Sequence, residues 1–96
     1  MRSALAAELG RRMDLVLPAL AAGATDWPVR HNHCFRRIVY DTLAGQPWRH
    51  RWPAPAVANM TETELAAAIA LCDRLAAEGT ALCRAWNAAS LRGRCP

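Results

Sequence analysis

The stretch TETELAAAIALCDRLAAEG, residues 61–79, carries the strongest structural signal in this chain. It opens with a capping box, because the Thr61 hydroxyl can accept a bond from the Glu64 amide while the Glu64 carboxylate reaches back to the Thr61 amide. Apolar side chains then follow at helical spacing: Leu65, Ile69, Cys72, Leu75 and Ala76. The pattern predicts a helix from Glu62 to about Glu78.

Gly79 allows two interpretations of the last part of the chain. A glycine can end a helix, and Thr80 would then cap a further helix that runs to about Leu91. Alternatively, one long helix contains Gly79, because one continuous stripe of small and apolar residues crosses it. The stripe comprises Leu65, Ile69, Cys72, Ala76, Gly79, Cys83 and Trp86. The sequence favours neither interpretation.

Helical spacing also marks the first half of the chain. Ser3 is a suitable N-cap for a helix over residues 4–17. Pro18 should kink or end this helix, or the helix should restart there as a short last turn before Gly23. A second helix is predicted from about Val29 or Arg30 to Ala44. Gly45 is expected to end it.

Residues 46–59 differ in composition from the predicted helices on either side. The segment holds three prolines and two tryptophans: Pro47, Trp48, Trp52, Pro53 and Pro55. Such a segment cannot form a long helix or a central strand. We predict an ordered loop that the tryptophans pin, with one short helical turn at about residues 56–60. Residues 1–96 are thus expected to form one all-α domain, a small three- to four-helix bundle with a Pro/Trp-rich ordered loop.

Length and charge exclude several function classes. The 96 residues are too few for an enzyme with separate cofactor and substrate domains. No apolar run approaches the roughly 20 residues of a membrane helix, so no membrane partner is expected. Charged residues interrupt the N-terminal segment, so we expect no signal peptide and a cytoplasmic protein with reduced thiols. No nucleotide-binding loop or catalytic carboxylate pair is present, which favours a protein that is not an enzyme.

Paired arginines between residues 30 and 51 indicate a binding surface. All twelve basic residues are arginine, which contacts carboxylates and phosphates through a planar fork. The candidate binding residues are Arg30, His33, Arg36, Arg37, Arg49 and Arg51. The net charge of +4 is modest for a nucleic-acid module. We predict a small non-catalytic accessory protein that presents this Arg/His surface to an acidic protein partner or to nucleic acid, or that forms a homo-oligomer through its alanine-rich faces.

The run WRHRW, residues 48–52, interleaves aromatic and basic side chains. Tryptophans in such a run can stack on bases while arginines contact phosphates. They can also cover the end of the bundle while the arginines point to water. The covering role is favoured.

A metal or thiol site is the alternative function. His31 and Cys34 lie three positions apart, so within a helix they share a face. Zinc requires further ligands, which Cys72, Cys83 or His50 would have to supply, and otherwise no cofactor is expected. The competing interpretation makes Cys34 a small core residue and places Cys72 and Cys83 in the core. Cys95 is expected to be exposed.

The residues NHCFRRI at 32–38, with Tyr40 and Asp41, resemble short helical bacterial proteins of unknown function that carry an N-H-C-F-x-R-I helix. The likeness covers about two thirds of the chain, from Arg30 onward. It continues through Trp48, Pro55-Ala56, the Thr61 capping box, Asn87 and Ser90-Leu91-Arg92. The resemblance implies a helical fold and a shared polar patch, and it implies no reaction.

Overall fold

Helix α4 (Glu62–Glu78) begins at the predicted capping box. In the computed structural model, which describes residues 1–94, the Glu64 N–H donates to Thr61 Oγ1 at 3.1 Å. The Thr61 N–H in turn donates to Glu64 Oε1 at 2.9 Å, and this bond lowers the pKa of the Glu64 carboxyl. Both predicted ends of the helix are confirmed.

Gly79 separates α4 from helix α5 (Thr80–Arg94), which resolves the choice that the sequence left open. Its φ of 74° and ψ of −138° turn the chain sharply, and L side chains rarely adopt this conformation. Thr80 does not cap α5, because it is the first residue of the helix, and its hydroxyl donates to Asp26 Oδ1 at 3.1 Å. The helix also continues past Leu91, where the sequence predicted its end.

Alanine at Gly79 and alanine at Gly10 should have opposite effects on stability. Gly79→Ala is expected to cost about 1–3 kcal/mol, because alanine is strained at this positive φ. Gly10→Ala lies inside a helix, where an added Cβ meets nothing within 4 Å, and should stabilise by about 0.5–1 kcal/mol. Urea denaturation measures both changes. A Gly79→Ala protein as stable as wild type would mean that α4 and α5 are one helix in solution.

The N-terminal part of the chain forms one continuous helix in three consecutive pieces. They are α1 (Arg2–Arg11), the π-helical turn η1 (Arg12–Val16) and α2 (Leu17–Ala22). The prediction that Ser3 caps this helix is wrong, because the helix already begins at Arg2. Arg2 Nε donates to the Met60 carbonyl at 3.0 Å, so a tertiary contact holds this first turn.

The π-helical turn explains how the helix passes Pro18. In a regular helix the proline ring would collide with the carbonyl of Asp14. The Leu17 N–H instead bonds to the Arg12 carbonyl, five residues back, and this wider turn gives the ring room. The predicted short last turn before Gly23 is therefore confirmed as α2.

Helix α3 (Asn32–Ala44) begins later than the sequence predicted. His31 is its N-cap residue and has an extended backbone, so Arg30 and His31 both precede the helix. In the segment before α3, Trp27 is buried and packs edge-on against Phe35 with ring centroids 5.9 Å apart. Gly45 ends α3 at a φ of 69°, as predicted.

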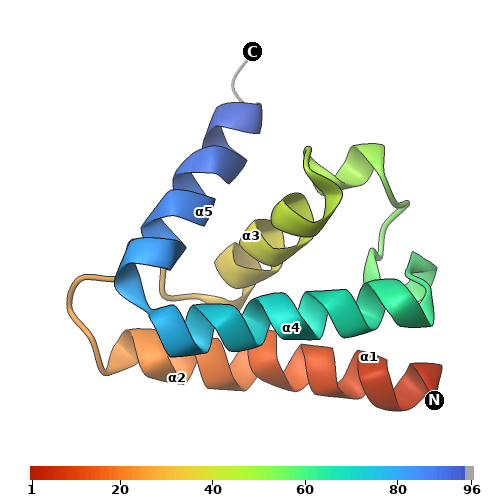
Figure 1. Ribbon diagram of the computed structural model, residues 1–96, viewed down its shortest axis with the longest axis horizontal. Helices are drawn as coiled ribbons and strands as arrows, with labels where there is room; N and C mark the ends of the chain where they lie inside the picture. The colour runs from red at the N-terminus through yellow and green to blue at the C-terminus, as the bar shows by residue number, and fades with distance from the viewer. Residues whose placement is uncertain (95–96) are drawn as a thin grey trace.

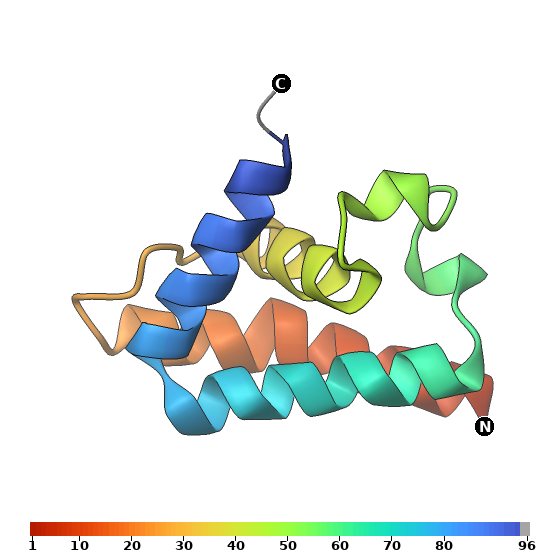
Figure 2. The same cartoon turned by 45° about the horizontal axis from the view of Figure 1, so that its top comes forward.

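Figure 1 shows α4 running alongside the α1–α2 helix, while α3 and α5 rise from this pair. Turned by 45°, the molecule shows α3 lying over the pair as a second layer (Figure 2). The core fills the space between the helices, and its largest fully buried side chains are Phe35, Leu9, Met13, Leu17, Ile38, Leu65, Leu75, Val39, Cys72 and Cys83. The described chain is an all-α bundle without strands, as predicted. None of its helices combines the length and apolarity needed to cross a membrane.

The segment between α3 and α4 is an ordered loop with two 3₁₀ turns, η2 (Trp48–His50) and η3 (Val57–Asn59). The second lies where the sequence predicted a short turn. Trp52 is 2% exposed and the Arg51 guanidinium lies 5.2 Å from the centre of its ring. Trp52 therefore covers the core with its arginine outside, whereas Trp48 is only half-buried.

Candidate binding site on helix α3

One face of α3 forms the wall of a cavity. His33, Arg36, Arg37 and Tyr40 are three or four positions apart, so their side chains lie along the same side of the helix. They line a cavity of about 280 Å³ together with Trp48, Pro55, Ala56 and Val57. The loop between α3 and α4 thus supplies the opposite wall. Three of the predicted binding residues meet here.

Arg36 pairs with a carboxylate of the same chain at a partly exposed position. It grips Asp14 with two nitrogens, Nε to Oδ1 at 2.9 Å and Nη2 to Oδ2 at 2.6 Å. Asp14 lies in the π-helical turn η1, so the turn that accommodates Pro18 also supplies the partner of Arg36. Arg36 lowers the pKa of the Asp14 carboxyl below its ordinary value of 3.8. The Arg36–Asp14 pair therefore contributes stability above about pH 3.8, and this contribution is lost as the pH falls below that value.

Arg37 keeps its positive charge without a carboxylate partner in residues 1–94. Its guanidinium donates to Asn87 Oδ1 at 2.7 Å and to Ser90 Oγ at 2.8 Å. Both acceptors are neutral and both lie on α5, so they fix the side chain without cancelling its charge. Arg37 therefore lines the cavity as a charged side chain whose guanidinium is anchored to α5.

The aromatic wall of the cavity is held from several sides. Tyr40 and Trp48 meet edge-on with ring centroids 5.7 Å apart, and the Arg49 guanidinium lies 4.8 Å from the centre of the Trp48 ring. Burial raises the pKa of Tyr40, so its phenol stays protonated at neutral pH. The wall is therefore apolar and preorganised.

Asp41 is the polar centre that holds this arrangement together. It is 5% exposed and accepts bonds from Ser90 Oγ at 2.6 Å and from the Trp48 N–H at 2.9 Å. Arg94 adds two more, from Nε at 2.8 Å and Nη2 at 2.9 Å. One carboxylate thereby joins α3, α5 and the loop. Of these residues, Arg94 and the structural role of Asp41 escaped the sequence-based prediction.

The other predicted binding residues lie outside this cavity. Arg30 donates from Nη1 to the Ala21 carbonyl at 2.8 Å, at the C-terminal end of α2. Arg51 pairs with Glu64, the capping residue of α4. Arg49 adjoins the cavity only through its contact with Trp48. The predicted Arg/His surface is therefore divided among separate places on the molecule.

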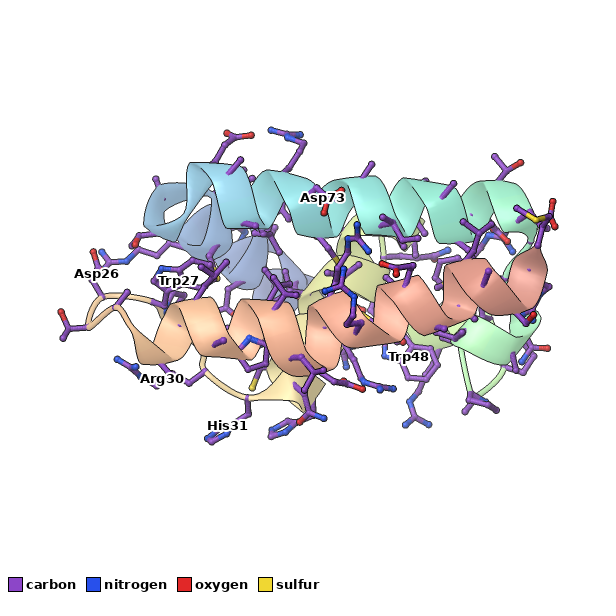
Figure 3. All side chains as sticks on the ribbon, turned by 90° about the horizontal axis from the view of Figure 1, so that it is seen from below. Asp26, Trp27, Arg30, His31, Trp48 and Asp73 are labelled. Atoms are coloured by element: carbon purple, nitrogen blue, oxygen red, sulfur yellow. The ribbon has the colours of Figure 1, made fainter. Side chains whose placement is uncertain are left out.

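His31 lies just before α3 as its N-cap residue, so the prediction that it belongs to the helix with Cys34 is corrected at this one position. Its ring stacks on that of His33 at 5.7 Å and points away from the helices (Figure 3). No group of three or more metal-ligating side chains gathers anywhere in residues 1–94. Cys72 and Cys83 are 1% and 0% exposed and belong to the core.

The thiols should differ sharply in reactivity. Burial raises the pKa of Cys72 to about 12 and that of Cys83 to about 11, against an ordinary value of 9.0. We expect iodoacetamide to modify the half-buried Cys34 in the native protein, and to reach Cys72 and Cys83 only on unfolding. Because both pKa values are raised by folding, stability should fall as the pH rises from about 9 toward 11.

Peptide mapping after timed alkylation measures this difference. It also separates Cys95, which lies outside the described residues. Modification of Cys72 or Cys83 faster than global unfolding would contradict their place in the core.

Comparison with protein-family models, with curated proteins and with solved structures finds no match to this chain.

Proposed function

We propose that this chain is a small non-catalytic interaction protein that binds an acidic segment of a protein partner at the α3 cavity. The observation that carries the proposal is the position of Arg37, a charge without a carboxylate partner in residues 1–94, beside an apolar wall of Tyr40 and Trp48. A segment that alternates carboxylates with apolar side chains fits both features. Its carboxylates would meet Arg37, and one apolar side chain would fill the cavity.

Charge and ring placement favour an acidic protein segment over nucleic acid. Six of the twelve arginines pair with carboxylates within residues 1–94, so half of the basic side chains already have an internal partner and would contribute less to binding a phosphate backbone. Stacking on bases also needs an open aromatic face. Trp52 is buried, and Trp48 is covered by Arg49 on one face.

The proposal keeps two further expectations from the sequence. The protein acts in the cytoplasm, where its thiols stay reduced. The resemblance to short helical bacterial proteins with an N-H-C-F-x-R-I helix also remains a prediction, and it places the proposed cavity on the shared helix.

Equilibrium binding of a fluorescein-labelled peptide of alternating Glu and Leu residues tests the proposal. Arg37→Gln should weaken binding by about tenfold or more, since a charge-assisted bond is lost. Arg92→Gln is the matched control, because it removes the same charge from an exposed residue that does not line the cavity. Val57→Glu, which puts a negative charge on the loop wall, should also weaken binding. Circular dichroism confirms that each variant is folded.

Three outcomes would contradict the proposal. The first is a failure of the wild-type protein to bind the peptide even at low ionic strength. Equal weakening by Arg37→Gln and Arg92→Gln would show attraction to the whole surface and no binding at the cavity. Tighter binding of a single-stranded or duplex oligonucleotide than of the peptide would assign the surface to nucleic acid.

A further inference from the structure

The end of α5 faces the turn after α3 (Figure 1), and residues of both segments line two further cavities. The first has a volume of about 260 Å³, and its walls include Asp41, Gly45, Pro47, Trp86, Ala89 and Gly93. The second has a volume of about 340 Å³ and is lined by Pro47, Arg49, His50, Gly93 and Arg94. Because Pro47 and Gly93 line both, the two cavities adjoin.

The second cavity gathers hydrogen-bond donors, and among residues 1–94 no acidic side chain lines it. Arg49 has no carboxylate partner in the described chain, and His50 is exposed. Arg94 uses Nε and Nη2 to bind Asp41, which leaves the two hydrogens of Nη1 without an acceptor among residues 1–94. An anionic group of a ligand would find several donors here.

The first cavity suits an apolar group. Although Asp41 lies at its wall, that carboxylate already accepts four bonds, so it offers little to a cationic ligand. The remaining wall is largely hydrocarbon, with the indole of Trp86, the ring of Pro47 and the methyl of Ala89. A ligand that reaches this cavity gains mainly from burying apolar surface.

Gly93 stands at the junction of the two cavities. A Cβ at this position would lie 3.8 Å from Pro47 Cδ, which is an ordinary contact. Alanine therefore fits without displacing the proline. A longer side chain would extend into the shared space and separate the two cavities.

We propose that the two cavities together form a binding site for a small amphipathic anion, an alkyl or aryl carboxylate. Its carboxylate meets Arg49, His50 and Arg94, and its apolar body lies against Trp86 and Pro47. The site is separate from the α3 cavity and does not depend on the binding of an acidic segment there.

A titration followed by ¹H–¹⁵N NMR tests this site with octanoate, acetate and octanol as probes. Octanoate should shift the amides of Gly45 and Gly93 and the indole N–H of Trp86. Acetate lacks the apolar body and octanol lacks the charge, so each should bind at least about tenfold more weakly. If octanol bound as tightly as octanoate, the cavity would recognise only the apolar group. Chemical shifts spread over the whole chain would show non-specific binding. Either result would overturn the proposal.

Two matched pairs of variants locate the site. Gly93→Leu should abolish octanoate binding while Gly93→Ala retains it. Arg49→Gln should weaken binding by about tenfold, while Arg92→Gln leaves it unchanged. Binding to Gly93→Leu as tight as to wild type would overturn the proposal. Such a failure leaves the acidic-segment proposal untouched, because that one is tested through Arg37 and Val57.

Discussion

Asp41→Ala is expected to lower the free energy of unfolding by about 2–4 kcal/mol, since it removes a buried carboxylate that accepts four hydrogen bonds and pairs with the partly exposed Arg94. The substitution leaves the Arg94 guanidinium, the Ser90 hydroxyl and the Trp48 N–H without their common acceptor. A domain of this size has a total stability of roughly 5–15 kcal/mol. The midpoint of urea denaturation, followed by circular dichroism, should therefore fall by a large fraction.

Asp73→Ala provides the matched control for this prediction. It removes the same charge from an exposed helix position, where Asp73 pairs with Arg12 at 2.8 Å. Exposed pairs of this kind contribute at most about 1 kcal/mol. If Asp41→Ala destabilised the protein no more than Asp73→Ala, the carboxylate would not be what joins α3, α5 and the loop.

Trp48→Ala should weaken binding of the acidic peptide by about thirtyfold or more, as expected for a tryptophan at the centre of an interface. The ring forms the apolar wall of the α3 cavity beside Tyr40 and is only half-buried. Its loss removes contact surface for the ligand, and the backbone N–H that bonds to Asp41 remains. Fluorescence anisotropy of the labelled peptide measures the change, at protein concentrations where circular dichroism shows the variant folded.

Trp52→Ala, at a position four residues after Trp48, should reduce stability and leave affinity for the peptide largely unchanged. Trp52 is 2% exposed and packs in the core, so its removal should cost about 3–5 kcal/mol of stability. Binding by the fraction that stays folded should change little, because Trp52 does not line the cavity. Equal losses of affinity in the two variants would contradict the assignment of Trp48 to the binding wall.

Local signals in the sequence predicted the parts of the fold that local interactions determine. The capping box at Thr61 and the end of α3 at Gly45 each depend on a few neighbouring residues, and both are confirmed. The start of α3 has no such local signal, because the spacing that predicted a helix from Val29 or Arg30 does not show that His31 keeps an extended backbone. The wide turn before Pro18 likewise follows from the need to continue the helix along the core.

For the candidate site too, the sequence predicted the part that local helix geometry determines. Helical spacing brings His33, Arg36 and Arg37 to one face, and the structure shows them together. Their electrostatic state depends on partners far away in the chain, since Arg36 meets Asp14 across 22 positions. The network of Asp41 reaches Arg94 across 53 positions. A single sequence does not reveal such pairs, so it could not show which arginines remain free.

Chemical-shift mapping of the acidic peptide on ¹⁵N-labelled protein tests the proposed function most directly. Binding at the α3 cavity predicts shifts at the Trp48 indole N–H and at the amides of His33, Arg37 and Val57, with little change along α1. These shifts should be lost in the folded Arg37→Gln protein and kept in Arg92→Gln. Shifts centred on α1 or α4, or a spectrum that the peptide leaves unchanged, would contradict a binding site on α3.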